Sequence, residues 1–421
     1  MFTEALRLYG KNDIKLEKFQ LPAIEKDEIL AKVVCDSLCM SSYKAAIQGP
    51  DHKRVPNDIA KNPIILGHEF CGEIVEVGEK WKGLYRAGDK FIIQPALNYK
   101  GTIDAPGYSF PYIGGCATYI IIPHQVMECG CLLPYDIESF FYGSLSEPMS
   151  CVIGSYKEFF HTTPGKHEHK MGVLEGGSLL VLAGAGPMGL GAIDYIIHCD
   201  RRPSRVIVTD INDARLEYAK KIISPETAKK NDVELIYVNT STIENPALLL
   251  LELNKNKGYD DILVMAPVKQ VVELADEILA IDGCLSFFAG PTNNDFKAEI
   301  NFYNIHYSST HFIGTVGGNS EDMLESISMI KKGLINPAAL VTHIGGLNCS
   351  VEATLKLPQI PGGKKLIYTH INLELTAIED FEKLGNDIPI FKHLSEIVKK
   401  NDGLWCEEAE KYLLESDSVN N

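Results

Sequence analysis

Hydrophobic residues in the first 150 positions fall into short runs interrupted by polar and glycine-containing segments. The runs at 29–34, 72–77 and 90–93 have the length and the β-branched content of strands. Turn signals at 78–79 and 87–89 separate these runs. This repetition of strand and turn predicts a Greek-key or barrel-like domain.

After about residue 155 the pattern alternates between strand-like and helix-like segments. Strands are predicted at 178–183, 205–209, 262–265 and 284–288, and helices at 188–198, 213–223 and 271–280. Such a βαβ rhythm predicts a doubly wound parallel sheet, so the chain as a whole is expected to be an α/β protein. From about residue 317 the pattern is helical, then weakly β-like, then helical again.

The segment after about Tyr368 is predicted to be an added, mostly helical element. Apolar residues recur there at helical spacing, at Ile388, Ile390, Leu394, Ile397 and Val398. The simplest role for this stripe is packing against the first domain, and a role at a functional site is the alternative.

A glycine-rich turn lies between the first strand and the first helix of the alternating segment. Gly184, Gly186 and Gly189 fit the pattern G-x-G-x-x-G, and Pro187 and Met188 stand between the last two glycines. These glycines permit a tight turn, close approach of a pyrophosphate and packing of helix on strand. The amides and dipole at the helix N-terminus also favour an anion, so the turn predicts a dinucleotide pocket.

Asp210 ends the second strand of this segment, near the spacing expected for a ribose-binding acid. Its carboxylate suits a ribose diol and repels a 2′-phosphate, which predicts NAD(H) in preference to NADP(H). Arg215 could pack beside the adenosine, and with Arg205 could offset that repulsion. The alternative interpretation of Asp210 is a helix N-cap.

Cys39, His68 and Glu69 form a candidate set of metal ligands, with Glu147 further along the chain. Cysteine, histidine and glutamate are good ligands for Zn²⁺, and three protein ligands leave the open position of a catalytic site. Taken singly, Cys39 is an ordinary small buried residue, His68 a core histidine and Glu147 a loop acid or helix-start residue. Together with the dinucleotide pattern, the set predicts an alcohol dehydrogenase.

The amino-acid composition restricts the classes of molecule that this chain can bind and the compartment in which it works. The 421 residues are 45% hydrophobic and carry a net charge of −16, which disfavours nucleic acid or an anionic membrane as partner. The pair Lys364–Lys365 is too short to change this and is interpreted as a solvated face. Eleven cysteines without a framework favour a reducing, cytoplasmic setting. No signal-peptide core follows Met1, and no apolar run reaches the roughly 18 residues of a membrane-spanning helix.

The chain resembles the zinc-dependent medium-chain dehydrogenase/reductase superfamily, particularly its polyol dehydrogenase branch, over roughly residues 1–370. The motifs that carry the resemblance are 67–72 (GHEFCG), 88–90 (GDK), 114–117 (GGCA), 147–150 (EPMS) and 184–189 (GAGPMG). The resemblance implies a GroES-like, β-rich catalytic domain over 1–157 and a Rossmann domain over 158–316. Residues 317–421 would return to the catalytic domain and add the helical extension.

By the same resemblance, Cys39, His68 and Glu69 bind the catalytic zinc, and Glu147 holds the zinc-bound water or becomes a fourth ligand. Many relatives carry a lobe with four cysteines for a structural zinc. The corresponding segment 94–114 contains no cysteine, so one zinc and no structural site are expected.

Lys44 stands where relatives often have a proton-relay histidine. The arrangement of Cys39, Ser41 and Lys44 resembles the L-sorbose-1-phosphate reductases. Ser41 would accept the alcohol proton and pass it toward the ribose hydroxyls or Lys44. Loops flanking the nicotinamide are implied at Ala266, Pro267, Val268, Ala289 and Thr315. Val268 and Thr315 fit a packing role equally well.

These observations predict an NAD(H)-linked, zinc-dependent oxidoreductase acting on a small polyol, with a polyol phosphate favoured. The leading pair is L-sorbose 1-phosphate and glucitol 6-phosphate, with the phosphate held by Lys44 and by cations at 52–54. An unphosphorylated sorbitol-type polyol or a threonine-type amino alcohol is the alternative. A more remote alternative is a relative that binds no zinc and has a structural or binding role. Since relatives are dimers or tetramers, a homodimer or homotetramer is expected.

Overall fold

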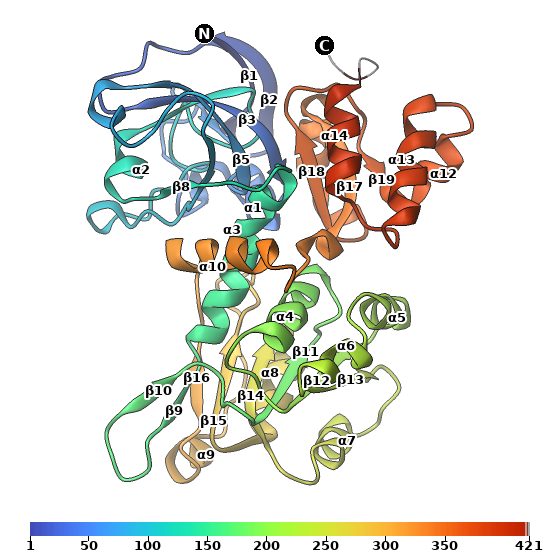
Figure 1. Cartoon of the computed structure of the whole chain (residues 1–421). Helices are drawn as coiled ribbons and strands as arrows, with labels where there is room; N and C mark the ends of the chain where they lie inside the picture. The colour runs from blue at the N-terminus through green and yellow to red at the C-terminus, as the bar shows by residue number, and fades with distance from the viewer. Residues whose placement is uncertain (417–418, 420–421) are drawn as a thin grey trace. The chain divides into compact units, whose positions relative to one another are not determined.

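The structure, a computed structural model, describes residues 1–416 and 419 (Figure 1). The chain divides into two compact units. Unit 1 comprises residues 1–148, 319–331 and 337–421, and unit 2 comprises residues 149–318 and 332–336.

Unit 1 is built on two sheets, as the strand-like runs of the first 150 residues predict. The smaller sheet has the order β2-β1-β4. The larger sheet has eight strands in the order β19-β17-β18-β3-β5-β6-β8, with β7 also paired to β3. The strands are β1 (Phe2–Gly10), β2 (Asp13–Gln20), β3 (Ile29–Ser37), β4 (Ile64–Ile65), β5 (Phe70–Val77), β6 (Lys90–Ile93), β7 (Tyr119–Ile122), β8 (Leu132–Pro134), β17 (Val341–Gly346), β18 (Lys364–Tyr368) and β19 (Thr376–Ala377).

Strand β3 is central because β5, β7 and β18 all pair with it in antiparallel register. Asp36 faces Phe70 on β5, and the Ser37 amide donates to the Glu69 carbonyl at 2.9 Å. This register sets the end of β3 beside the start of β5. The segments that carry Cys39 and Glu69 are therefore neighbours in space although they are far apart in sequence.

Helices complete unit 1 from several parts of the chain. They are α1 (Met40–Gln48), α2 (His124–Glu128), α10 (Ser320–Lys331), α11 (Ser350–Leu355), α12 (Phe381–Leu384), α13 (Pro389–Lys400) and α14 (Glu407–Glu415). Helix α3 (Phe141–Lys157) begins in unit 1 and ends in unit 2.

The predicted C-terminal stripe is largely confirmed, because its members on α13 are buried. Ile388 is the exception: it precedes the helix as its N-cap residue and is 42% exposed.

Unit 2 is a doubly wound sheet, which confirms the βαβ prediction. Six parallel strands have the order β13-β12-β11-β14-β15-β16, in which the order reverses beside β11. The strands are β11 (Ser178–Leu182), β12 (Arg205–Asp210), β13 (Glu234–Asn239), β14 (Tyr259–Val264), β15 (Leu279–Phe287) and β16 (His311–Ile313). The helices are α4 (Pro187–His198), α5 (Asp213–Ile222), α6 (Pro225–Lys230), α7 (Pro246–Leu253), α8 (Lys269–Glu277) and α9 (Phe302–Tyr307).

Some of these elements depart from the sequence prediction. Helix α8 ends at Glu277, and Leu279 already pairs with Tyr259 as part of β15, so the predicted helix to residue 280 was too long. A short hairpin of β9 (Phe160–Thr162) and β10 (His169–Met171) also precedes the sheet. Nothing in the hydrophobic pattern had indicated that hairpin.

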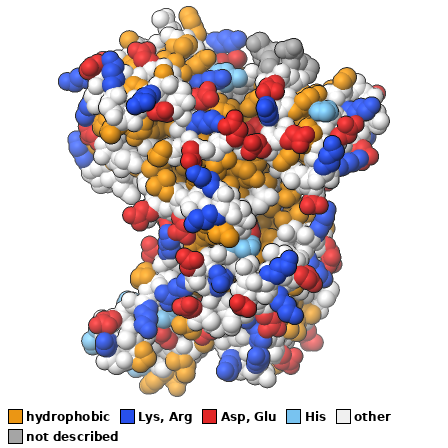
Figure 2. Space-filling model, in the orientation of Figure 1, with side chains coloured by type: hydrophobic (Ala, Val, Ile, Leu, Met, Phe, Trp, Pro, Cys, Tyr) orange, Lys and Arg blue, Asp and Glu red, His pale blue; other side chains and the backbone are white. Residues whose placement is uncertain are grey.

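On the face drawn in Figure 2, acidic and basic side chains are interspersed rather than segregated. Within the described residues, none of the helices combines the length and apolar character that crossing a lipid bilayer requires.

Candidate metal centre and cofactor loop

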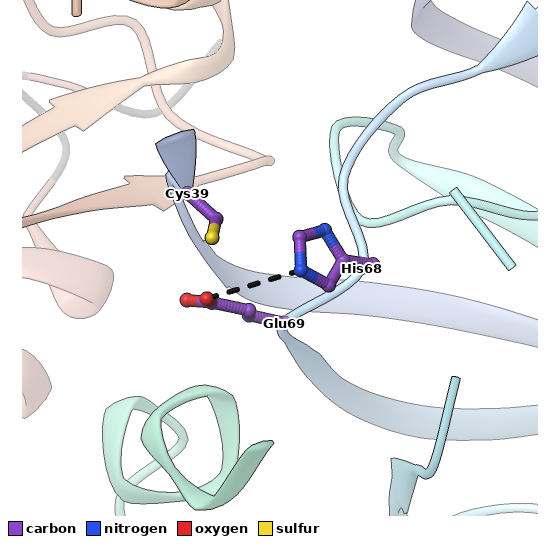
Figure 3. Close-up of side chains that lie close together, drawn as sticks. All are labelled: Cys39, His68 and Glu69. Atoms are coloured by element: carbon purple, nitrogen blue, oxygen red, sulfur yellow. Dashed lines mark ion pairs between the residues drawn. The ribbon is translucent and has the colours of Figure 1, made fainter. Parts of the chain in front are cut away.

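Three side chains of unit 1 converge at the junction of β3, α1 and β5 (Figure 3). Cys39 is the N-cap residue of α1, while His68 and Glu69 immediately precede β5. One ligand atom from each residue lies within 4.8 Å of the others. Within residues 1–416 and 419 this is the one group of three or more such side chains with that spacing.

Hydrogen bonds orient the His68 ring. Its Nδ1 lies 3.2 Å from Ser42 Oγ and 3.0 Å from Tyr108 Oη, and both partners are buried. Its Nε2 lies 4.0 Å from Glu69 Oε1, which is the contact dashed in Figure 3. Anchoring one ring nitrogen fixes the tautomer and presents the other nitrogen to a metal.

Glu69 is held by a buried cation. Lys364 Nζ, on β18, lies 2.5 Å from both carboxylate oxygens, and Ser37 Oγ also donates to this carboxylate. Burial by itself lowers the pKa of Lys364, but the charges of Glu69 and Cys39 outweigh it and raise that pKa. The pair Lys364–Lys365 was predicted to be a solvated face. That prediction was wrong, because the two lysines are 7% and 2% exposed.

The Cys39 thiol shares this charged environment. Burial and the Glu69 charge raise the pKa of Cys39, while Lys364 and a hydrogen bond with Ser41 oppose the rise. The Cys39 Sγ to Ser41 Oγ distance is 2.9 Å. Metals bind the thiolate, so a cation at this site would compete with the thiol proton.

Glu147 lies in the second turn of α3, not in a loop or at a helix start. It is 8% exposed and is not a member of the group of close ligand atoms. Burial raises the pKa of Glu147 to about 7; the Glu69 and Cys39 charges add to the rise, and His68 and Lys364 oppose it. These interactions show that Glu147 is a neighbour of the three ligands. It is an acid that can become negatively charged near neutral pH.

The donor set suits Zn²⁺. Thiolate, imidazole and carboxylate are its usual protein ligands, and the described residues provide three of them with partners that orient His68 and Glu69. Nothing in the sequence indicated that Lys364 is buried, since a pair of adjacent lysines is typical of a solvated face. Tyr108 and Ser42 left no signal either, because their approach to His68 depends on the tertiary fold.

A group of cations lies beside the ligands. Burial and Lys53 lower the pKa of Lys44, against the opposing charge of Cys39. Burial, Arg54, Lys53 and Lys44 together lower the pKa of His52 to about 4. The guanidinium of Arg54 stands 5.5 Å from the centre of the Tyr108 ring, and its buried Nε has no hydrogen-bond partner. We call Lys44, Lys53 and Arg54 the cationic cluster; His52 lies beside them, and with this pKa its imidazole is neutral near pH 7.

Unit 2 carries the glycine turn between β11 and α4. A Cβ on Gly189 would approach the Gly184 carbonyl oxygen to 1.9 Å, so helix and strand meet there without a side chain. A Cβ on Gly186 would meet nothing within 4 Å, which leaves the backbone open to a ligand. The left-handed residue of the turn is Ala183, with φ 56°, rather than a glycine. Pro187 and Met188 begin α4.

Asp210 fastens this turn to the end of β12. It is 5% exposed; one carboxylate oxygen accepts the Ala185 amide at 3.2 Å, and the other accepts the Ile211 amide at 2.8 Å. The alternative of a helix N-cap was wrong, because Asn212 caps α5 by accepting the Arg215 amide. The Arg215 side chain is exposed.

The remaining cofactor candidates lie at the same edge of the sheet. Ala266, Pro267 and Val268 follow β14, Ala289 follows β15, and Thr315 follows β16. The carboxyl ends of parallel strands share one edge, which is where ligands bind in open α/β sheets. Val268 is the N-cap residue of α8 and is 43% exposed, so its side chain is not a core packing residue.

Known proteins resemble this chain in sequence and in domain types. Residues 25–130 match the alcohol dehydrogenase GroES-like domain, and residues 187–332 match the zinc-binding dehydrogenase family. Three relatives each align over 98% of this chain and 97% of their own length. They are uncharacterized protein YggP of Escherichia coli (50% identical), mannitol-1-phosphate 5-dehydrogenase of Aliivibrio fischeri (50%) and L-sorbose 1-phosphate reductase of Klebsiella pneumoniae (46%).

This chain belongs to the zinc-type medium-chain dehydrogenase/reductase superfamily. The fold agrees: the crystal structure of 2R,3R-butanediol dehydrogenase from Bacillus subtilis superimposes with a TM-score of 0.71 at 21% identity. That match covers 87% of this chain and 99% of the other. The chain is thus an oxidoreductase of the polyol dehydrogenase type, with a GroES-like domain and a Rossmann domain.

Proposed function

We propose that this dehydrogenase uses one zinc ion and NAD(H) to interconvert a polyol phosphate and a ketose phosphate. The favoured pair is glucitol 6-phosphate and L-sorbose 1-phosphate. The observation that carries the proposal is the cationic cluster beside the three ligands Cys39, His68 and Glu69.

The metal would be held by Cys39, His68 and Glu69, with Glu147 close by as a further acid. Zinc at this position supplies Lewis acidity, which lowers the pKa of an alcohol and polarises a ketone. Lys364 keeps the Glu69 carboxylate in place and offsets part of its charge. The buried hydroxyls of Ser42 and Tyr108 hold the imidazole of His68.

Ser41 is the first proton acceptor in this scheme. Its Oγ lies 2.9 Å from Cys39 Sγ and 3.4 Å from His68 Nε2, so it borders the position of the reacting alcohol. Lys44, three residues further along α1, would guide the proton from Ser41 toward the ribose hydroxyls.

The substrate phosphate would bind the cationic cluster. The chain has a net charge of −16, so a bound dianion needs local cations. Lys44 supplies a point charge and Arg54 a planar fork for phosphate oxygens. Two of the relatives reported above are named for phosphorylated substrates, at 50% and 46% identity over 98% of this chain.

The cofactor would bind unit 2 through the glycine turn and Asp210. The exposed backbone at Gly186 leaves room for a pyrophosphate, and Asp210 would accept the ribose hydroxyls. A 2′-phosphate would meet the Asp210 carboxylate, and a like-charge contact of this kind costs several kcal/mol. We expect a higher kcat/KM with NADH than with NADPH, and the opposite order would refute this assignment.

Kinetics of substituted enzymes test the phosphate assignment. Lys44→Ala and Arg54→Ala should each raise KM for L-sorbose 1-phosphate by about tenfold, because each removes one charge-assisted contact. The KM for free L-sorbose should change little, and Lys61→Ala, an exposed lysine of the neighbouring loop, is the matched control.

Two other results are informative. If Lys44→Ala lowers kcat equally for both ketoses, Lys44 acts in proton transfer and not in phosphate binding. If the unsubstituted enzyme prefers free polyols or threonine, the phosphate assignment fails.

A further inference from the structure

One buried carboxylate of the C-terminal extension joins two elements that lead to the metal centre. Glu410, on α14, is 2% exposed. It accepts the amide N–H of Phe140 at 2.5 Å, the amide N–H of Phe141 at 2.8 Å and the Tyr368 Oη–H at 2.8 Å. Figure 1 shows α14 alongside β18, in agreement with the Tyr368 contact.

The two amides belong to the start of α3. The first amides of a helix have no partner within the helix, and a nearby serine or aspartate commonly caps them. Ser139 stands at the right place in the sequence, but its Oγ is buried without a hydrogen-bond partner. The cap comes instead from Glu410, whose two carboxyl oxygens each accept one of these amides.

Both elements continue to the metal centre. Glu147 is six residues after Phe141 on α3, roughly 9 Å along a helix that rises 1.5 Å per residue. Tyr368 ends the strand that begins with Lys364, and Lys364 holds Glu69. The Trp405 indole N–H donates to the Tyr368 hydroxyl at 2.8 Å, which fixes the third partner of the carboxylate.

We propose that Glu410 is a positioning residue for the metal centre. By binding the start of α3 and the end of β18, it sets where Glu147 and Lys364 stand relative to the three ligands. The C-terminal extension then acts on the reaction through one carboxylate, in addition to packing. This inference rests on the proposed zinc site.

Metal binding to the full-length protein tests the proposal. Glu410→Gln keeps the size of the side chain but replaces one acceptor oxygen by an NH2 group, which cannot accept an N–H, so the two oxygens can no longer serve all three donors. We expect its zinc dissociation constant, measured by competition with a chromophoric chelator, to rise at least about tenfold. The visible spectrum of the Co²⁺-substituted protein should shift, while NADH affinity stays within about twofold of wild type. Glu408→Gln, an exposed glutamate on the same helix, should match wild type throughout.

The possible results separate failure of the Glu410 proposal from failure of the proposed function. A Glu410→Gln protein that melts at a lower temperature but binds zinc and Co²⁺ like wild type overturns the proposal, because Glu410 is then only structural. A wild-type protein that binds no metal overturns the proposed function instead. If Glu410→Gln does not fold, Tyr368→Phe decides, since it removes only the link to β18 and should weaken zinc binding about threefold. Unchanged binding in Tyr368→Phe overturns the proposal.

Discussion

At the scale of single residues, the ion pair between Lys364 and Glu69 makes the sharpest prediction. Removing one partner of a buried pair leaves a charge without compensation, at a cost of about 3–5 kcal/mol. Metal-free Lys364→Met should lose about this much unfolding free energy in urea titrations. Added zinc should restore more stability to it than to wild type, because the cation then compensates Glu69.

Lys365→Met is the matched control. Lys365 is also buried, but its Nζ donates only to the carbonyls of Pro361 and Gly363 among the contacts described. The unfolding free energy lost by Lys365→Met should be the same with and without zinc. Equal stabilisation of both variants by zinc would mean that Lys364 is not coupled to the metal ligands.

Asp36 leads to a second prediction at this scale, which concerns how the stability of the fold depends on pH. It is fully buried; Oδ2 accepts the Cys116 thiol at 3.2 Å and Oδ1 has no hydrogen-bond partner. Burial raises the pKa of Asp36 from 3.8 to about 8. The folded state therefore keeps a proton that the unfolded state loses above pH 4. This contribution to stability is complete below pH 4 and is lost as pH rises to about 8.

Asp36→Asn should remove this dependence. Between pH 5 and pH 8 the unfolding free energy of wild type should fall relative to the variant by about 1.4 kcal/mol per pH unit at most. Urea titrations of the metal-free proteins at both pH values measure the difference. Parallel pH profiles for the two proteins would show that Asp36 is ionised when folded.

The ligand types and the glycine spacing could be predicted from sequence, because chemistry restricts which residues occur there. The partners of those residues could not. Lys364 follows its site ligand Glu69 by 295 positions, and only the antiparallel pairing of β18 with β3 brings them together.

At the scale of elements, the C-terminal helices should act as part of the unit 1 core. Trp405 and Phe381 are fully buried, and loss of such a residue costs about 3–5 kcal/mol. Removing residues 370–421 should therefore lower the melting temperature of unit 1 by at least about 10 °C. Calorimetry measures the shift, and binding of NADH should persist. Melting at the wild-type temperature would show that the extension is an appendage.

Elements such as β11, α4 and α13 were predictable because one hydrophobic pattern covers each of them: a continuous apolar run in β11 and helical spacing in α4 and α13. The pairing of β3 with β5, β7 and β18 was not, since it depends on contacts between distant segments. The hairpin of β9 and β10 was missed because its short strands flank an exposed polar tip and show no alternation.

At the scale of the whole molecule, the two units carry separable parts of the proposed reaction. Cys39 belongs to unit 1, and the glycine turn belongs to unit 2. Cys39→Ser should therefore abolish turnover and weaken zinc binding, while NADH affinity measured by fluorescence remains close to wild type. Loss of NADH binding in this variant would contradict the assignment of the two functions to separate units.

The central claim is that a zinc-dependent dehydrogenase recognises a phosphorylated sugar, and one comparison tests it most directly. The measurement is kcat/KM of the zinc-loaded enzyme, with NADH, for L-sorbose 1-phosphate and for L-sorbose. Two charge-assisted contacts of about 1.5 kcal/mol each predict a preference of about 100-fold for the phosphate. Equal values, or a preference for the free ketose, would contradict the account.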